Sequence, residues 1–163
     1  MPNHCSQDLF VYGKEIFVID FMEFSQEGLE VLSANKYIPY PENFKKMDEV
    51  AALAREQGNY IKDGFNSGGY QWCIDNWGTK WGIYRSNLVS YKLAGSRSRA
   101  TYYFESAWSP PIPVIHKMSD KFPALRFLLK YYERGAQFKG IFEIKAGQIL
   151  RHLQEDYHGS RGG

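Results

Sequence analysis

The sequence predicts an α+β fold in which an antiparallel β-sheet has its helices packed on one face. Three observations lead to this class. Segments with strand-like alternation are joined by turns or by segments with helical periodicity, their order is strand, helices, two strands, helix and two strands, and no linker is long enough to divide domains. We therefore expect a single domain over residues 1–157 and a flexible tail over residues 158–163.

The composition excludes several classes of protein. The formal net charge of +2 is too small to indicate a nucleic-acid-binding protein by itself, while the aromatic share of 17% is high. No apolar run approaches the roughly 18 residues of a membrane span, and the amino terminus has no signal-peptide pattern. The two cysteines and four histidines do not have the spacing of metal ligands. We therefore expect a cytoplasmic protein, without a cofactor, a metal or a membrane contact.

The first elements follow from short-range patterns. Residues 6–13 alternate between apolar and polar side chains and end at a glycine, which predicts a strand. Phe17, Phe21 and Phe24 recur at helical spacing, so we expect a helix next, although the strand-forming residues around them also fit a strand. Residues 35–44 contain two prolines, which predict an extended connection.

A second helix is expected over residues 43–57. Asn43 can cap its first turn, and Gly58 can end it. Its apolar residues recur at helical spacing, which predicts a face in the core. That face consists of Phe44, Met47, Val50, Ala51 and Ala54. A glycine-rich loop follows, in which Asn66 or Ser67 can cap a short third helix.

Two strands and a further helix are expected in the next part of the chain. Residues 83–93 and 100–106 have the pattern of a hairpin around Gly95. Residues 106–123 open with serines, one of which can cap a helix, and with prolines that suit a first helical turn. The predicted core face of this helix consists of Ile112, Ile115, Met118 and Phe122.

The last part of the chain predicts a second hairpin. Residues 125–133 and 137–147 have strand-like patterns about Arg134 and Gly135, and a polar tail follows them. An antiparallel sheet built in this way can leave its second face open to solvent or to a partner. That open face would present Tyr, Lys and Arg.

The segment YQWCIDNWGTKWGIY, residues 70–84, contains three of the four tryptophans. On a helix its aromatic residues fall along one stripe, which would pack against the sheet. The stripe consists of Tyr70, Cys73 or Ile74, Trp77, Trp81 and Tyr84. We expect Trp77 and Trp81 to join the helix to the sheet and to a corner at residues 108–111. The structural motif that we predict consists of Trp72, Cys73, Asn76, Trp77, Trp81, Trp108 and Pro110.

A catalytic interpretation of the same segment has less support. Cys73 can act as a nucleophile with His116 as base and Asp75 as the orienting carboxylate. It can also join His4 and Cys5 as a metal ligand. The neighbours of Cys73 are bulky and apolar, however, and a small buried residue fits that position better. We therefore expect a protein that is not an enzyme.

A basic segment follows the tryptophan motif. Residues 76–104 contain five basic residues and no acidic one, whereas residues 15–49 contain eight acidic residues and three basic ones. Tyr and Arg are enriched in protein interfaces, and cations interleaved with aromatic rings also suit single-stranded nucleic acid, here over residues 80–103. Both interpretations remain open, and the acidic segment can instead face a basic partner. The partner-binding residues that we predict are Lys80, Arg85, Tyr91, Lys92, Arg97, Arg99 and Tyr103.

Three pieces of the chain together carry a resemblance to a known family. They are the start MPNHCS, the motif WCIDNWGTKW over residues 72–81, and FESAWSPPIPVIHKMSDKFPALRF over residues 104–127, which YYERGAQFKG follows. The chain resembles the phage- and plasmid-borne family with the YubB-type ferredoxin-like domain. That family's start usually reads MPNWCSN, whereas His4 and Gln7 stand here in place of the tryptophan and the asparagine.

The resemblance implies a ferredoxin-like α+β sandwich, and this topology brings no iron–sulfur cluster. It carries no activity and therefore no catalytic residue. It also implies a context, because mobile elements use small proteins to disable host processes, including CRISPR-Cas and other defences, by binding. We therefore expect a non-enzymatic accessory protein whose leading partner is a host protein or protein complex, with nucleic acid as the alternative. The sequence leaves the oligomeric state open.

Overall fold

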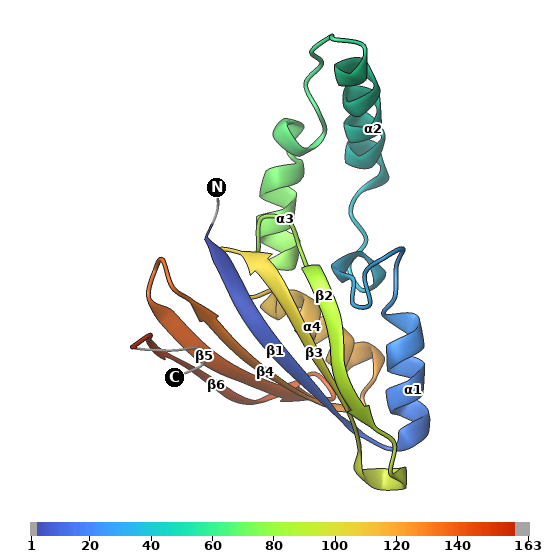
Figure 1. The fold of residues 1–163 in the computed structure, drawn as a ribbon, viewed down its shortest axis with the longest axis vertical. Helices are drawn as coiled ribbons and strands as arrows, with labels where there is room; N and C mark the ends of the chain where they lie inside the picture. The colour runs from blue at the N-terminus through green and yellow to red at the C-terminus, as the bar shows by residue number, and fades with distance from the viewer. Residues whose placement is uncertain (1–2, 159–163) are drawn as a thin grey trace.

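The computed structural model describes residues 3–158 of the chain. Within these residues, six strands form one antiparallel sheet in the order β2-β3-β1-β4-β5-β6 (Figure 1). The strands are β1 His4–Gly13, β2 Tyr84–Lys92, β3 Ser98–Ala107, β4 Arg126–Glu133, β5 Phe138–Lys145 and β6 Gln148–Asp156. The α-helices are α1 Glu15–Phe24, α2 Glu42–Glu56, α3 Gly69–Trp77 and α4 Ile112–Lys121, and the short 3₁₀ helices are η1 Ala34–Lys36, η2 Phe65–Ser67 and η3 Gly95–Arg97.

The first four strands and two of the helices have the ferredoxin-like connection order. The chain runs β1, α1, β2, β3, α4, β4, and the strands lie in the order β2-β3-β1-β4, so that β1 and β3 are central. The hairpins to β5 and β6 extend the sheet beyond β4. The predicted α+β fold, with an antiparallel sheet and helices on one face, is therefore confirmed.

The core lies between the sheet and the helices α1 and α4. Along β1, side chains alternate between this core and the opposite face: Leu9 and Val11 are fully buried, while Phe10 and Tyr12 are half-buried on the other side. Phe21 of α1 lies at the centre of the core. Its ring meets Tyr102, Phe122 and Phe127 edge-on, with centroid separations of 5.8, 5.5 and 5.4 Å.

The expected phenylalanine stripe of α1 is partly wrong. The helix forms as predicted, but its buried residues are Val18 and Phe21, while Phe17 is exposed. Three- and four-residue spacings both fit one helical face, and the sheet covers the side that is centred on Val18 and Phe21.

The predicted polar tail is wrong for residues 148–156, which form the strand β6. This strand pairs with β5 across a turn at Ala146 and Gly147. All of its residues are exposed, so no buried face imposed an alternating pattern that the sequence could reveal. Of the predicted flexible tail, residues 159–163 lie outside the described residues.

The helix α2 and the segment that returns from it project away from the sheet (Figure 1). We call residues 42–64 the arm. Asp48 accepts a hydrogen bond of 2.8 Å from the backbone N–H of Phe65, and Arg55 lies 3.8 Å from Asp63. Only the small residues Ala51 and Ala54 of α2 are buried. The predicted core face of this helix is therefore wrong for Met47 and Val50, because no strand or helix of the core covers them.

Three predicted helix caps are also wrong. Pro41 takes the N-cap position of α2 in place of Asn43, and Pro111 takes that of α4 in place of a serine. Proline fits these positions because its fixed φ suits the entry to a helix and its missing N–H is not needed there. Asn66 and Ser67 lie within η2, and Gly68 precedes α3.

The helix α3 is shorter than we predicted from the aromatic stripe of residues 70–84. Gly78 has φ of 74° and ends the helix in the left-handed conformation, which glycine adopts without a steric cost. Trp81 and Tyr84 therefore do not lie on the helix with Trp77. None of the described helices is long and apolar enough to cross a lipid bilayer.

Candidate binding surfaces

The tryptophans of the chain fall into an inner and an outer pair. Trp72 and Trp77 meet edge-on with centroids 5.2 Å apart, and Trp77 is only 8% exposed. Trp81 and Trp108 are 42% and 40% exposed. The prediction that Trp81 locks the helix to the sheet is therefore wrong, because the chain leaves the helix at Gly78 before it reaches Trp81.

Lys80 lies between the two outer tryptophans. Its Nζ is 4.8 Å from the ring centroid of Trp81 and 4.9 Å from that of Trp108, which is cation–π geometry on both sides. Trp108 has φ of 71°, a conformation that non-glycine residues rarely adopt. The rings of Tyr70 and Trp108 meet edge-on, with their centroids 6.4 Å apart. Lys80 is thus tied to this aromatic corner.

Three further members of the predicted structural motif are buried or make local contacts. Cys73 is buried. Asn76 donates from its side-chain amide to the carbonyl of Trp72, at 2.9 Å. The carbonyl of Pro110 accepts a hydrogen bond from the N–H of Ile112, at 2.9 Å. These are local contacts of α3 and of the turn that precedes α4.

The predicted partner-binding residues do not form one patch. Tyr84 of β2 is opposite Glu105 of β3 at one end of this strand pair, and Lys92 is opposite Arg99 at the other. Along β3, Arg99 and Glu105 are six positions apart, which corresponds to about 20 Å. Arg97 lies in η3, beyond the second end.

Two of the predicted residues, Arg85 and Tyr103, donate hydrogen bonds to the carboxylate of Glu105. Arg85 donates to Glu105 at 2.8 Å, and the Tyr103 hydroxyl donates to the same carboxylate at 2.9 Å. His4 joins this cluster, because its Nδ1 lies 2.7 Å from the Tyr84 hydroxyl and 3.7 Å from Glu105. Burial and then the charge of Glu105 raise the pKa of Tyr84 to about 12. The charge of Arg85 is therefore already balanced within the molecule.

Tyr91 lies on the other side of the sheet from Arg99 and Lys92. It is opposite Ala100, whose side chain is buried on the helix-covered side. Residues directly opposite one another in an antiparallel pair share a face, so Tyr91 is on the helix side at the sheet edge. The basic segment therefore supplies side chains to both faces of the sheet.

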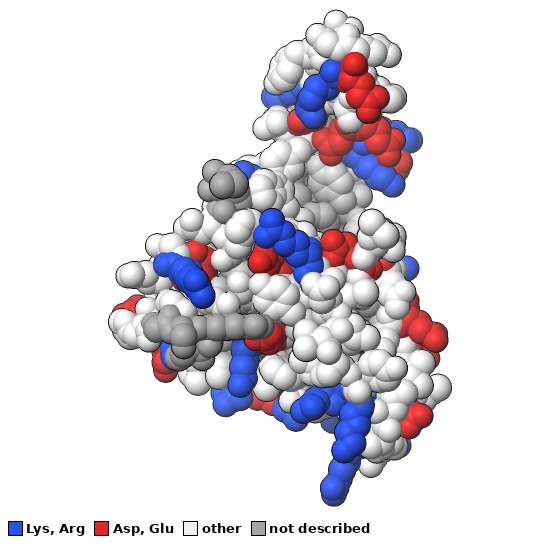
Figure 2. Space-filling view, in the orientation of Figure 1, with Lys and Arg blue, Asp and Glu red and all other residues white. Residues whose placement is uncertain are grey.

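The open face of the sheet carries aromatic rings with cations over them. The rings of Phe10 and Tyr12 stack with centroids 6.4 Å apart. The Arg126 guanidinium lies 4.3 Å from the Tyr12 ring, and Lys130 Nζ lies 5.8 Å from the Phe10 ring. Glu143 binds Arg126 at 2.6 Å. Figure 2 shows that Lys and Arg on this side are interrupted by acidic and uncharged side chains.

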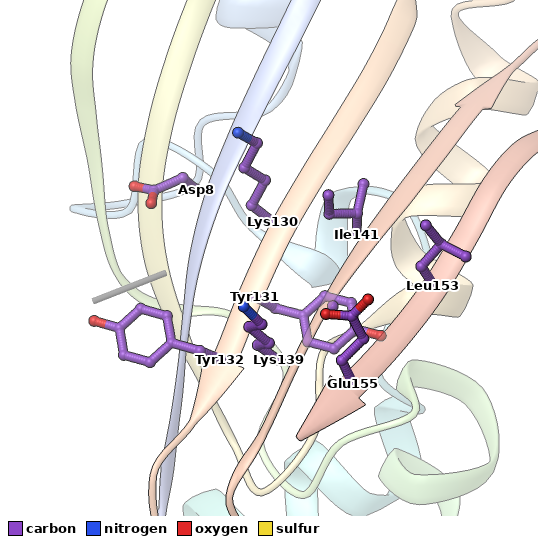
Figure 3. Close-up of a pocket in the computed structure, with 9 residues that line it drawn as sticks. Asp8, Lys130, Tyr131, Tyr132, Lys139, Ile141, Leu153 and Glu155 are labelled. Atoms are coloured by element: carbon purple, nitrogen blue, oxygen red, sulfur yellow. The ribbon is translucent and has the colours of Figure 1, made fainter. Parts of the chain in front are cut away.

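A hollow of about 190 Å³ lies on the open face near the β6 edge (Figure 3). Asp8 is opposite Lys130 in the β1–β4 register, and Lys139 is opposite Glu155 in the β5–β6 register. The charges that surround the hollow are therefore balanced in sign. Its lining consists of Asp8, Lys130, Tyr131, Tyr132, Lys139, Gly140, Ile141, Leu153 and Glu155.

The arm presents a separate apolar surface. Five large apolar or aromatic side chains are exposed on it, and Leu53 and Tyr60 are 60% and 85% exposed. We call this set the arm surface; it consists of Met47, Val50, Leu53, Tyr60 and Ile61. Between α2 and the returning segment it forms a shallow hollow of about 240 Å³, which Lys46 and Lys62 border.

The sequence did not predict that the apolar side chains of the arm surface are exposed. Helical periodicity shows that a helix has an apolar face but does not show what covers that face. Two signals were present: Leu53 falls outside the predicted core stripe, and Tyr60 and Ile61 interrupt an otherwise polar loop.

The structure does not bring together the suggested catalytic trio. Cys73 is buried, and burial, followed by the charge of Asp48, raises the pKa of its thiol to about 11. His116 lies 3.4 Å from Asp120 on its own helix, and Asp75 accepts a hydrogen bond from Gln71. In residues 3–158, no three His, Cys, Asp or Glu side chains are grouped as metal ligands.

The fold and these surfaces define a ferredoxin-like α+β protein whose sheet has an open face. The chain belongs to the Api92-like family: the model described as the ferredoxin-like domain in Api92-like protein matches residues 80–161, about half of the chain. This finding confirms the ferredoxin-like part of the resemblance, while the YubB-type assignment and the phage or plasmid origin stay predictions.

The fold is also found in a solved structure. The crystal structure of a protein api92 from Yersinia pseudotuberculosis matches with a TM-score of 0.62 and 9% sequence identity, over 99% of this chain and 100% of that chain. At this identity the likeness concerns the fold alone. No curated protein matches the chain.

Proposed function

We propose that this chain is a non-enzymatic accessory protein of a phage or plasmid, which binds a host protein in the bacterial cytoplasm through the arm surface. The observation that carries the proposal is the exposure of five large apolar or aromatic side chains on a helix and loop that stand away from the core. Three of these side chains, Met47, Val50 and Ile61, line one hollow, and an exposed apolar patch is typical of a protein interaction site.

The arm gains little from its own packing. Its helix buries two alanine side chains, whereas each large apolar side chain left in water forgoes about 1.5–3 kcal/mol of burial free energy. A partner that covers Val50 and Leu53 would recover part of this free energy. The arm helix is then the ligand and the partner supplies an apolar groove, which is a common mode of recognition.

Two lysines border the hollow of the arm surface, while the arm as a whole carries both basic and acidic side chains (Figure 2). Lys46 and Lys62 line this hollow together with Met47, Val50 and Ile61. Carboxylates at the edge of the partner's groove would complement these two ammonium groups and would increase the rate of association. The proposed partner therefore has an apolar groove with carboxylates placed to meet these two lysines.

A component of a bacterial defence system, such as a CRISPR-Cas complex, is the kind of partner that we propose. The support for this step is the resemblance to phage- and plasmid-borne proteins, because such elements benefit when host defence is blocked. Binding of the arm would inhibit the complex by occupying one of its assembly surfaces. In cells with active CRISPR-Cas, expression of the protein should raise the transformation efficiency of a targeted plasmid, and Leu53→Asp should abolish the gain.

The binding proposal is tested by copurification from a bacterial host under gentle conditions. The wild-type chain should retain a stoichiometric protein, and the variant with Val50→Asp and Leu53→Asp should lose it. Leu29→Asp is the matched control, because Leu29 is fully exposed but lies outside the arm. Retention by the arm variant, or no partner in repeated experiments with the wild type, would exclude the arm as the binding surface.

Single-stranded nucleic-acid binding is the second candidate function. The observation that favours it is the position of Phe10 and Tyr12 on the central strand β1, on the open face and beneath Lys130 and Arg126. Rings on the central strands of a ferredoxin-like sheet are suited to stacking with bases. The acidic residues among the cations of this face weigh against it.

This candidate predicts oligonucleotide binding that weakens as salt increases. Phe10→Ala should weaken it through lost stacking, and Arg97→Ala combined with Arg99→Ala should weaken it through lost phosphate contacts. Binding that is absent, or that does not respond to salt, would exclude this function and leave the arm proposal unaffected.

A further inference from the structure

The two edges of the sheet differ in how well they are protected. At the β2 edge, the pairing with β3 is interrupted by two register shifts. Ser86 of β2 donates from its backbone N–H (2.9 Å) and from its hydroxyl to the carboxylate of Glu30, and its hydroxyl accepts from the N–H of Leu32 at 3.2 Å. The connection before the arm therefore covers this edge, and irregular pairing also discourages the addition of another strand.

The β6 edge is less protected along its described residues: its pairing with β5 has a single register shift, between Glu143 and Ile144, and is regular over residues 151–156. The strand is nine residues long, every residue is exposed, and three of its exposed side chains, Ile149, Leu150 and Leu153, are large and apolar. A long edge strand of this kind offers its unpaired backbone N–H and C=O groups to another strand.

The side chains of β6 are complementary to themselves in one register. Arg151, Leu153 and Glu155 are opposite Glu143, Ile141 and Lys139 of β5, and so they share the open face of the sheet. When two copies of β6 pair antiparallel about a two-fold axis at Leu153, Arg151 of each copy is opposite Glu155 of the other. The two Leu153 side chains then meet at the axis.

We propose that β6 is the contact between two copies of this chain, paired antiparallel and centred on Leu153. Arg151 of each copy, which also lies 3.3 Å from Glu143 of its own chain, then faces Glu155 of the other copy on either side of the central leucine pair. The two sheets become continuous with their open faces on the same side. The contact is isologous, which is the commonest arrangement in homo-oligomers. On this account the hollow near the β6 edge, which Leu153 and Glu155 line, borders the contact between the copies.

Charge reversal tests both the contact and its register. Arg151→Glu places two carboxylates opposite each other, and Glu155→Arg places two guanidinium groups opposite each other, so each variant alone should be a monomer. When the two variants are mixed, every facing pair is again of opposite charge, and a heterodimer should form. Light scattering during size exclusion gives the masses, and a tag on one variant separates the heterodimer from either homodimer.

Two further variants complete the experiment. Leu153→Lys places two ammonium groups at the axis and should also give a monomer, whereas Lys92→Glu on the β2 edge should stay a dimer; circular dichroism verifies that each variant is folded. A wild-type chain that is monomeric at about 100 μM would overturn the proposal, since a dimer weaker than that is negligible in cells. Charge-reversed variants that stay dimeric alone, or stay monomeric when mixed, would overturn the proposed register. Neither result bears on the arm surface.

Discussion

The indole N–H of Trp77 donates a hydrogen bond of 2.8 Å to the backbone carbonyl of Ile38. The bond joins α3 to the segment that leads into the arm, and the same ring packs against Tyr40 with centroids 5.8 Å apart. The buried tryptophan therefore connects the arm to the body of the molecule, which is a more specific role than the contact with the sheet that the sequence predicts.

Replacement of this ring should be costly. Trp77→Ala should lower the free energy of unfolding by about 3–5 kcal/mol, because it leaves a cavity and removes the partner of the Ile38 carbonyl. Trp77→Phe keeps much of the burial and should cost less. Trp81→Ala should cost less than about 1 kcal/mol, since Trp81 is largely exposed. Urea unfolding measures all three values, and similar losses for Trp77→Ala and Trp81→Ala would contradict the division into inner and outer tryptophans.

Stability should fall in alkaline solution. Burial raises the pKa of Cys73 to about 11 and that of Cys5 to about 12, from an ordinary thiol value of 9.0. Below pH 9 both thiols are protonated in the folded and unfolded chain, so they add no pH dependence. As the pH rises from 9 toward 11–12, only the unfolded chain loses these protons, and the free energy of unfolding decreases by at most about 1.4 kcal/mol per pH unit for each thiol.

Guanidinium unfolding between pH 8 and 11 measures this slope. Cys73→Ala removes one of the two thiols and should reduce the slope of the folded variant, whatever its absolute stability. An unchanged slope would show that this thiol titrates alike in both states.

Both cysteines should resist thiol reagents in the folded protein. Cys5 and Cys73 are free and buried, and their raised pKa values keep the reactive thiolate scarce at neutral pH. Ellman's reagent at pH 8 should therefore release its chromophore slowly, and at the full rate once urea is added. Rapid labelling of Cys73 before unfolding would revive the interpretation of this residue as a nucleophile.

The arm should open locally before the sheet unfolds. Its helix buries only two small side chains, whereas β1 and β3 pair with neighbours on both edges. Backbone amides of α2 should therefore exchange with deuterium orders of magnitude faster than those of β1. Asp48→Ala removes the acceptor for the Phe65 N–H and should speed exchange in the arm while it leaves β1 unchanged. Equal protection in α2 and β1 would show that the arm belongs to the core.

The central strands were predictable because each has one buried face. In β1, Leu9 and Val11 alternate with half-buried Phe10 and Tyr12, and this burial is what selects a two-residue period. β6 has no buried residue to impose such a period, so its sequence carries no alternating pattern that would reveal a strand. Which side of a helix faces the core likewise depends on the tertiary structure. Helical periodicity alone therefore predicts Met47 and Val50 of α2 as core residues, although they are exposed.

The charge of the candidate surfaces depends on acidic residues that lie outside the basic segment of residues 76–104. The acid-free segment ends at Phe104, and the next residue, Glu105, is the carboxylate that Arg85 binds. In the same way, Glu143 lies far along the chain from the basic segment and yet balances Arg126 and Arg151 on the open face. The basic segment is therefore continuous in sequence but is not a continuous positive surface.

Photo-crosslinking from the arm tests the central claim most directly. A benzophenone amino acid in place of Leu53 should form, in living host cells, one covalent adduct with a single protein, and the adduct should disappear when untagged wild-type chain is overexpressed. The same amino acid in place of Leu29 should form no such adduct. No adduct from Leu53, or the same adducts from both positions, would contradict the account of the arm as the surface that binds a host protein.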